Sequence, residues 1–355
     1  MNCFLVDTPV TKENYVFETR TELFAHNTMQ QVSQSIDPWD SAAGTGILGR
    51  IGDVLSARGF SAQPITIAEA TVATVGVPGK AEPPLIVSAR GLNQFARQPR
   101  RETFDIKDFV PLLNNATSIQ GSVYGETWSD RFQQAVIASD ELSEAISRVE
   151  LTQSYPANGG QYVRQIETLA QLILTHETRG TDRDLFWMSL GSWDHHESLK
   201  ANLAAEFQEL NVGLELLEQE LKAHGYFENV TVVVTSDFAR TLTANSGTGS
   251  DHAWGGNMFV FGGSVKGNQI FGDYPSDISP GGPLNVGRGR LIPTLSWESM
   301  FNAVAEWVGV ETPEDLDYCM PNRHKTRTTL FSKSDLFDDE TQPARSLRQS
   351  IRKGA

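Results

Sequence analysis

The stretch from residue 185 to residue 263 restricts the possible fold more than any other part of the chain. It contains two short apolar runs, residues 185–190 and 230–234, each of a length suited to a strand. Between them, bulky apolar residues recur every three or four positions, as on one face of an α-helix: Leu199, Leu203, Phe207, Leu210, Leu214, Leu217 and Leu221. A strand, a helix and a second strand in this order form a right-handed crossover between parallel strands. We therefore predict an α/β fold with a central, mostly parallel sheet flanked by helices, in which a helix near residues 197–224 joins two neighbouring strands.

Each apolar run is followed by small residues and an aspartate, with histidines close by. Asp194 follows the first run and Asp237 the second, while His196 and His252 lie in the adjoining loops. Because ligands bind beyond the carboxyl ends of parallel strands, we expect these side chains at one edge of the sheet, with His195 pointing elsewhere or supporting a ligand. Two carboxylates and two imidazoles suit a divalent metal, and zinc is the expected cofactor, as one or two ions. The alternative role for an aspartate after a strand is a helix cap or a turn former.

The charge of the chain limits its partners. There are 44 acidic and 29 basic residues, so the net charge is −15 at pH 7 and binding to nucleic acid or to an anionic membrane is not expected. No apolar run approaches the roughly 18 residues of a membrane span, and the N-terminal residues lack the pattern of a secretory signal. The two cysteines, Cys3 and Cys319, form no metal-binding motif and indicate no compartment.

Signals outside the central stretch predict further helices and strands. Helical spacing of apolar residues predicts a helix over residues 162–174 and another that starts after Ser296 and ends at Gly309. Short strands are expected within residues 65–77 and 85–87, and again over 257–263, before a glycine-rich hairpin. The hydrophobic fraction of 39% is enough for a sizeable core. We predict a single domain over residues 1–325 and a charged, disordered tail over 326–355.

Two more residues are candidates for catalysis. Thr21 precedes a stretch that can form a helix, and its hydroxyl would either face an anion at the positive end of the helix dipole or cap the helix. Arg240, three residues beyond Asp237, is suited to bidentate pairing with a tetrahedral anion. The alternative for Arg240 is a surface or salt-bridging role.

Several motifs in combination resemble one known family. They are ELFAHNTMQQ at 22–31, GTGILGRIGDVL at 44–55, GSWDHHESL at 191–199, VTVVVTSDFART at 230–241, GTGSDHAWGGNMFVFGGSVKG at 247–267 and RGRLIPTLSWESM at 288–300. Over about residues 1–325 the chain is similar to the domain of unknown function 1501, a family related to the alkaline phosphatase and sulfatase superfamily. The resemblance implies an alkaline-phosphatase-like fold and a metal-dependent hydrolase whose substrate is a small anionic phosphate or sulfate ester.

The resemblance also implies roles for single residues. The TSDF segment is similar to a T-S-D-H segment whose aspartate and histidine bind one metal, so Asp237 matches the ligand and Phe238 replaces the histidine. The GSDHAWG segment matches a late histidine ligand at His252. WDHH resembles a D-x-H element, which places Asp194 and His196 among the ligands.

Two departures from the family pattern bear on activity. The superfamily nucleophile is a serine or threonine at a helix start, and Thr21 is the nearest match, with Glu22 where relatives often carry histidine. Relatives also open with a strand and a glycine-rich segment carrying an aspartate ahead of the position of Met1, so the resemblance implies a chain truncated at its N-terminus and lacking that first strand region. We therefore expect a weak or inactive hydrolase. The alternative is a non-catalytic binding or scaffold protein that retains the fold; localisation, ester class and oligomeric state stay open.

Overall fold

The structure is a computed structural model that describes residues 9–40, 44–88, 123–325 and 328–338. Its elements are, in chain order, α1 (Tyr15–Thr19), α2 (His26–Ser35), α3 (Ile47–Ala57), β1 (Ala62–Ile67), the 3-10 helix η2 (Val72–Thr74), β2 (Leu85–Val87), α5 (Val123–Ser147), α6 (Gly160–Leu174), α7 (His176–Arg179), β3 (Arg183–Met188), α8 (Leu199–Ala223), η4 (Phe227–Asn229), β4 (Thr231–Val234), β5 (Phe259–Gly262), α9 (Trp297–Val308), α10 (Pro313–Cys319), η5 (Arg323–Lys325) and α11 (Lys333–Leu336).

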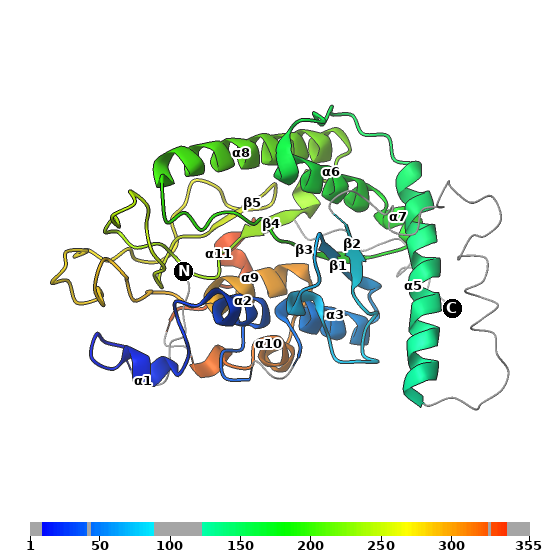
Figure 1. The fold of residues 1–355 in the computed structure, drawn as a ribbon. Helices are drawn as coiled ribbons and strands as arrows, with labels where there is room; N and C mark the ends of the chain where they lie inside the picture. The colour runs from blue at the N-terminus through cyan, green and yellow to red at the C-terminus, as the bar shows by residue number, and fades with distance from the viewer. Residues whose placement is uncertain (1–8, 41–43, 89–122, 326–327, 339–355) are drawn as a thin grey trace.

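A three-stranded parallel sheet in the order β2-β1-β3 lies at the centre of the fold. β1 pairs with β3 from Ala62↔Arg183 to Ile67↔Met188, and with β2 from Ile65↔Leu85 to Ile67↔Val87. Helices α6 and α8 lie over one face of the strands, and α3, α9 and α10 lie on the other (Figure 1). The prediction of an α/β fold with a parallel sheet flanked by helices is confirmed in this form.

The predicted pairing of the two strands around the long helix is wrong. α8 does connect β3 to β4, close to the predicted residues 197–224, but the two strands belong to separate sheets. β3 pairs with β1, whereas β4 pairs antiparallel with β5 from Thr231↔Gly262 to Val234↔Phe259. Consecutive strands are neighbours in only about two-thirds of cases, because pairing depends on contacts between segments that are distant in sequence.

Apolar residues are buried on both faces of the parallel sheet. Alternation along β1 directs Ile65 and Ile67 into a cluster with α6 and α8, where both are fully buried. Thr66, between them, points to the other face, where its Oγ1 lies 2.9 Å from Oγ1 of Thr74 in η2. A second and larger cluster on that side is built mainly from α2, α3 and α9.

Elements with a strong local signal form where they were predicted. β2 covers residues 85–87 and α6 covers the predicted 162–174. α9 begins directly after Ser296 and ends at Gly309, whose φ of 120° suits glycine better than other residues. The hairpin predicted after β5 is not formed, because residues 263–275 contain no strand.

Part of the predicted tail is packed against the core. Residues 328–338 include α11, and the ring of Phe337 is buried and stacked on Trp307, with 5.1 Å between ring centroids. The remaining tail residues, 339–355, and the N-terminal residues around Met1 lie outside the described residues. Among the described helices, none combines the length and the apolar composition needed to cross a membrane.

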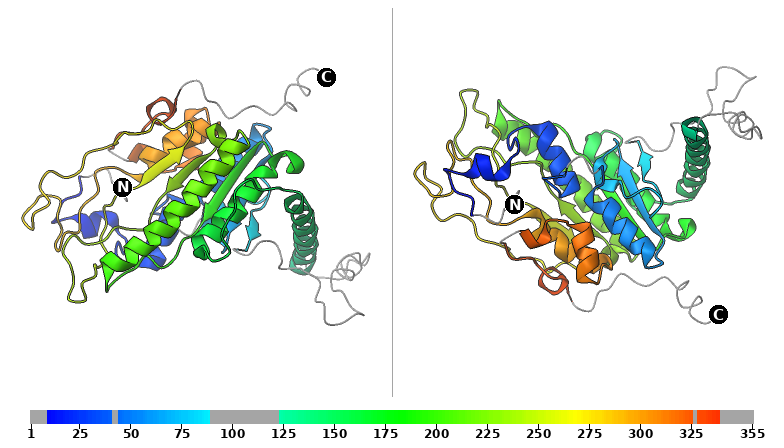
Figure 2. Two further views of the ribbon diagram at one scale, coloured as in Figure 1. Left: turned by 90° about the horizontal axis from the view of Figure 1, so that it is seen from above. Right: turned by 90° about the horizontal axis from the view of Figure 1, so that it is seen from below.

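The loops that follow β3 and β4 lie at the end of the molecule opposite α5 (Figures 1 and 2). They are close to the start of α2. This helix packs into one hydrophobic cluster with α9 and residues of the parallel sheet. The predicted site residues, except Thr21 between α1 and α2, are found in these loops.

Candidate metal centre

Imidazoles and carboxylates from four segments meet at this end of the molecule. The loop after β3 carries Asp194 and His196, the segment after β4 carries Asp237, and the glycine-rich loop that follows carries His252. The fifth member, His26, is the first residue of α2 and was not predicted. We call these five side chains the His–Asp cluster. One ligand atom from each of His26, Asp194 and His252 can be chosen so that all lie within 4.8 Å of one another.

The Asp194 carboxylate is the centre of the cluster. Nε2 of His196 lies 3.0 Å from Asp194 Oδ1, and Nε2 of His252 lies 3.1 Å from the same oxygen. Nε2 of His26 lies 3.3 Å from Asp194 Oδ2. The two Nε2 atoms of His196 and His252 are 3.1 Å apart. The structure therefore brings three of the four predicted ligands into contact, and their role as ligands stays a prediction.

The other ring nitrogen of each imidazole faces an atom that only accepts hydrogen bonds. Nδ1 of His26 is 2.6 Å from Asp237 Oδ2, Nδ1 of His196 is 3.0 Å from Asp251 Oδ1, and Nδ1 of His252 is 2.7 Å from the carbonyl oxygen of Phe24. Both a carboxylate ionised at neutral pH and a backbone carbonyl require a donor, so we infer that each Nδ1 carries the hydrogen. In the neutral ring, Nε2 then presents its lone pair.

Three lone pairs directed at one carboxylate repel one another unless a positive charge lies between them. His26 shows the effect most clearly: its Nε2 is buried and makes no hydrogen bond, although Asp194 Oδ2 is only 3.3 Å away. Either a cation or added protons on the Nε2 atoms would relieve this repulsion. Among the residues that the structure describes, the one donor to Asp194 other than these imidazoles is the Arg240 guanidinium, which contacts the carboxylate from the side of Ser250.

The donor set fits a zinc ion. Histidines that bind metal donate their second ring N–H to a carboxylate or a carbonyl, which is the arrangement of all three imidazoles here. Tetrahedral zinc with Zn–N bonds of about 2.0 Å requires nitrogen atoms about 3.3 Å apart, close to the 3.1 Å between Nε2 of His196 and His252. Asp237 joins the cluster through Nδ1 of His26, so the structure places it behind a ligand rather than beside the other three.

Electrostatic contacts keep two carboxyl groups ionised. Burial by itself would raise the pKa of Asp194, but the contact with the Arg240 guanidinium outweighs this effect and the pKa falls to about 2. Hydrogen bonds from Asn245 and His196 likewise lower the pKa of Asp251 to about 2. Both groups therefore carry full negative charge at neutral pH, which favours a bound cation.

Arg240 is tightly held. Its Nε donates to Ser250 Oγ at 3.0 Å, one terminal nitrogen donates to the carbonyl oxygen of Ser250, and the other contacts Asp194 Oδ1. The backbone of Arg240 also forms an antiparallel bridge with His252. The guanidinium is thus fixed next to the central carboxylate, where it can meet an anion only at the cluster itself.

Phe238 forms one wall of the cluster. Its ring is buried and lies 4.5 Å, between centroids, from the rings of both His26 and His252. Packing of this kind restrains the two imidazole planes, whereas a phenyl ring cannot bind an ion. The cluster therefore fits one ion better than two.

Contrary to the prediction, Thr21 does not lie at the start of a helix. α2 begins at His26 with Ala25 as its N-cap residue, so the predicted helix start next to Thr21 is wrong. Thr21 is in the loop between α1 and α2, where its carbonyl oxygen accepts a hydrogen bond from the N–H of Leu23. A catalytic role for its hydroxyl stays a prediction.

The prediction from the sequence did not include two residues of the site, because it was based on residues that follow strands. His26 opens a helix, and its partner Asp237 is far away in sequence. Asp251 directly precedes His252, so a search for donors beside each predicted ligand would have found it. His195 behaves as expected: it points to α8, with Nε2 2.7 Å from Glu206 Oε2.

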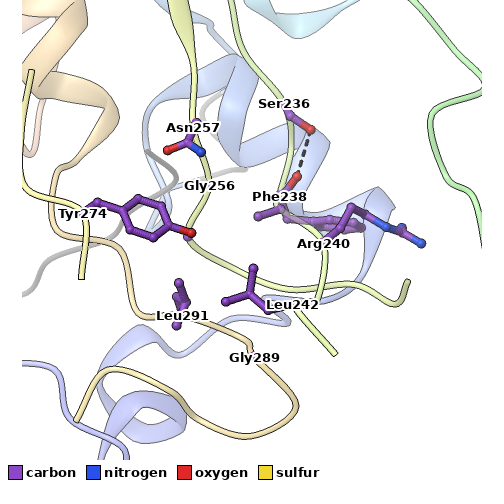
Figure 3. Close-up of a pocket in the computed structure, with 11 residues that line it drawn as sticks. Ser236, Phe238, Arg240, Leu242, Gly256, Asn257, Tyr274, Gly289 and Leu291 are labelled. Atoms are coloured by element: carbon purple, nitrogen blue, oxygen red, sulfur yellow. Dashed lines mark hydrogen bonds between the residues drawn. The ribbon is translucent and has the colours of Figure 1, made fainter. Parts of the chain in front are cut away.

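A pocket of about 290 Å³ lies beside the segment that carries Asp237 and Arg240. Leu242 and Leu291 project into it from one side and the hydroxyl of Tyr274 from another, while the side chain of Arg240 extends away from it (Figure 3). It is lined by Ser236, Phe238, Ala239, Arg240, Leu242, Gly255, Gly256, Asn257, Tyr274, Gly289 and Leu291. None of the five side chains of the His–Asp cluster is among these lining residues.

Comparison with known proteins identifies one family. A family model described as "Protein of unknown function (DUF1501)" matches residues 15–279, a range that includes every member of the His–Asp cluster. No curated protein and no solved structure matches the chain.

Proposed function

The chain belongs to the DUF1501 family, whose model matches more than half of it, and we propose that it is a zinc-dependent hydrolase of phosphate or sulfate esters. The observation that carries the metal part of the proposal is the convergence of three Nε2 atoms on Asp194, each with its Nδ1 anchored on an acceptor. The ester chemistry rests on the resemblance of the TSDF, WDHH and GSDHAWG segments to the alkaline phosphatase and sulfatase superfamily.

We propose that the ion is held by four side chains: His26, Asp194, His196 and His252. Asp237 would orient His26, and Asp251 would orient His196, by accepting the Nδ1 hydrogen. When bound, zinc lowers the pKa of an attacking hydroxyl or water and stabilises the negative charge that develops on the ester.

The proposed role of Arg240 is to stabilise the tetrahedral anion next to Asp194. Ser250 holds the guanidinium through two of its nitrogens, so the third stays directed at the cluster without reorganisation during the reaction. From this position the remaining terminal nitrogen, which contacts Asp194, would donate to one oxygen of a phosphoryl or sulfuryl group.

The attacking group is either the Thr21 hydroxyl or water. The helix that begins at His26 has Ala25 at its N-cap, so no hydroxyl is present at the helix start itself. This favours water as the attacking group. Phe238 in place of a ligand limits the centre to one ion, and we therefore expect turnover slower than that of a two-ion phosphatase, in which both reacting oxygens are clamped.

The test combines elemental analysis with an ester screen. The purified chain is stripped with a chelator, reloaded with zinc, and assayed with 4-nitrophenyl phosphate and 4-nitrophenyl sulfate. Near-stoichiometric zinc and a turnover that Asp194→Asn abolishes would support the proposal, whereas His195→Gln should leave both unchanged. Bound zinc without turnover of either ester would instead favour a binding or scaffold protein. Failure to bind zinc at all would refute the metal centre.

A further inference from the structure

Arg288 has a backbone conformation that an arginine rarely adopts. Its φ is 57°, and it lies between two glycines that also have positive φ, Gly287 at 114° and Gly289 at 75°. A glycine at position 288 would adopt this conformation without strain. Non-glycine residues in the left-handed region cluster at functional sites, where the surrounding structure keeps them in this strained conformation. We therefore expect the side chain of Arg288 to have a role that glycine could not fill.

The surrounding loop is built to hold this conformation. Asn285 is buried, and its Oδ1 accepts hydrogen bonds from the N–H groups of Gly287 at 3.0 Å and Gly289 at 3.1 Å. Its amide nitrogen donates to the carbonyl oxygen of Ser279 at 2.9 Å. The carbonyl oxygen of Arg288 accepts from the N–H of Thr243 at 3.2 Å, which ties the loop to the segment that carries Arg240.

The guanidinium of Arg288 stands on the outer side of the His–Asp cluster. Its Nη2 is 2.5 Å from Asp251 Oδ2, and the other oxygen of Asp251 is 3.0 Å from Nδ1 of His196. Asp251 and His196 therefore lie between Arg288 and Asp194. The side chain of Arg288 is 47% exposed, compared with 22% for Arg240.

Arg288 has unused hydrogen-bond donors that Arg240 lacks, and among the described residues its guanidinium does not pack over an aromatic ring as that of Arg290 does. In Arg240, Nε and both terminal nitrogens have hydrogen-bond partners. Arg290 donates from Nε to the carbonyl oxygen of His252 at 3.0 Å, and its guanidinium lies over the ring of Phe24. Within the described part of the chain, the only side-chain contact of Arg288 is the one with Asp251, so its remaining N–H groups are available to a ligand.

We propose that Arg288 binds a second anionic group of the substrate, separate from the ester group at the His–Asp cluster. The substrate class is then a phosphate or sulfate ester that carries a further anionic group, such as a carboxylate. This inference rests on the proposed function for the position of the ester, and it adds a charge requirement that a simple ester does not meet. A guanidinium with free, half-exposed donors is the group that proteins use to bind a carboxylate or phosphate in bidentate fashion.

The experiment compares two probes that cannot be hydrolysed, propylphosphonate and 3-phosphonopropionate, which differ by a carboxylate in place of a methyl group. Affinities are measured by calorimetry on zinc-loaded protein, and zinc content is measured in parallel. Wild-type protein should prefer 3-phosphonopropionate. Arg288→Gly should lower the affinity for that probe by roughly 10- to 100-fold, the effect of a charge-assisted contact, and should change the affinity for propylphosphonate by less than about threefold because that probe lacks the group that Arg288 binds.

Arg288→Gly also separates binding from a purely structural role. It relieves the positive φ while removing one exposed ion pair, so the unfolding temperature should stay within about 2 °C of wild type. Asn268→Gly is the matched control, because Asn268 has the same φ of 57° elsewhere and should alter neither affinity. Loss of zinc in Arg288→Gly would overturn the inference, since Arg288 would then act by holding Asp251. An equal loss of affinity for both probes would also overturn it.

Metal-free protein distinguishes failure of the inference from failure of the proposed function. If wild type binds no zinc, the proposed centre fails; a preference for 3-phosphonopropionate that disappears in Arg288→Gly would still support the second anion site. If wild type binds zinc and shows no preference between the probes, the inference fails and the metal centre stands.

Discussion

Ionisable side chains in the loops that hold the His–Asp cluster differ in their hydrogen-bond partners from those in the helices beside them. In the α8 region each group meets a partner of the complementary kind: Glu220 is fully buried and accepts from the N–H groups of Thr152 and Gln153, both at 2.8 Å. Next to the cluster, His195 has Glu206 at one nitrogen and the amide of Asn202 at the other. In the cluster itself the Nε2 atoms face a carboxylate with no donor between them. These ionisable groups of the helical region are thus fully partnered, whereas the cluster leaves room for a cation or for added protons on the Nε2 atoms.

Two carboxyl groups show the same contrast. Glu298 in α9 is buried, and burial raises its pKa to about 7, while the pKa of Asp194 is about 2. In the core the acid is neutralised by keeping its proton. In the loops the acid stays charged and gathers positive groups around it, which is how a binding site differs from a packed interior.

The strongest test of this difference between the two regions is to remove the central carboxylate of the cluster. Asp194→Asn should weaken zinc binding by more than about 100-fold, since it removes the group on which three imidazoles converge and should exceed the effect of losing an outer partner. Competition with a chromogenic chelator measures the affinity. His195→Gln, in the adjacent position, is the control and should change it by less than about threefold because His195 is directed to Glu206. Equal effects of the two substitutions would contradict the assignment.

Glu298→Gln tests the other half of the comparison. The folded protein keeps the proton of Glu298 up to a pKa of about 7, while the unfolded chain loses it near the ordinary value of 4.5. The contribution of this group to stability is therefore complete below pH 4.5 and is lost as the pH rises to about 7. Over that range wild type should lose about 3 kcal/mol of unfolding free energy that Glu298→Gln does not lose. Denaturant titrations at pH 5 and pH 8 measure it, and parallel pH profiles for the two proteins would count against a neutral Glu298.

Loss of the carboxylates behind the imidazoles should have a smaller effect. Asp237→Asn and Asp251→Asn each leave the proposed ligands in place but replace the charged acceptor at Nδ1 of His26 or His196 with a neutral amide. We expect a zinc affinity 10- to 100-fold below wild type, the usual effect of such partners. Chelator competition again provides the measurement. Affinities equal to wild type would mean that these hydrogen bonds do not set the orientation of the two rings.

The smallest effect is expected for Thr21→Ala. Because α2 begins at His26 and not next to Thr21, we expect unchanged zinc content and a turnover within about threefold of wild type, as for a residue that does not attack the ester. Steady-state assays with the ester that the protein accepts give the result. A loss of more than about 100-fold at constant zinc content would identify Thr21 as the nucleophile.

Much of the local structure and part of the site could be predicted from the sequence. The helices over 162–174 and after Ser296 follow from apolar spacing, which depends only on residues within a few turns of one another. Asp194, His196 and His252 were expected together because each follows a strand or a glycine-rich loop, and the structure brings them into contact. Even with the strand pairing wrong, the loops meet, because α8 leads away from the loop after β3 and the chain then comes back through β4.

The contacts that give the cluster its chemistry were decided only by the tertiary structure. Which strand pairs with β3 or β4 depends on β1 and β5, and neither is marked as a partner by the apolar runs themselves. His26 reaches Asp237 across most of the chain, and that contact determines which nitrogen of His26 faces Asp194. Residue types and periodicity are local properties of a sequence, so they predict helices, strands and candidate donors. The direction of a lone pair depends on atoms brought together from distant segments, and only the folded chain sets it.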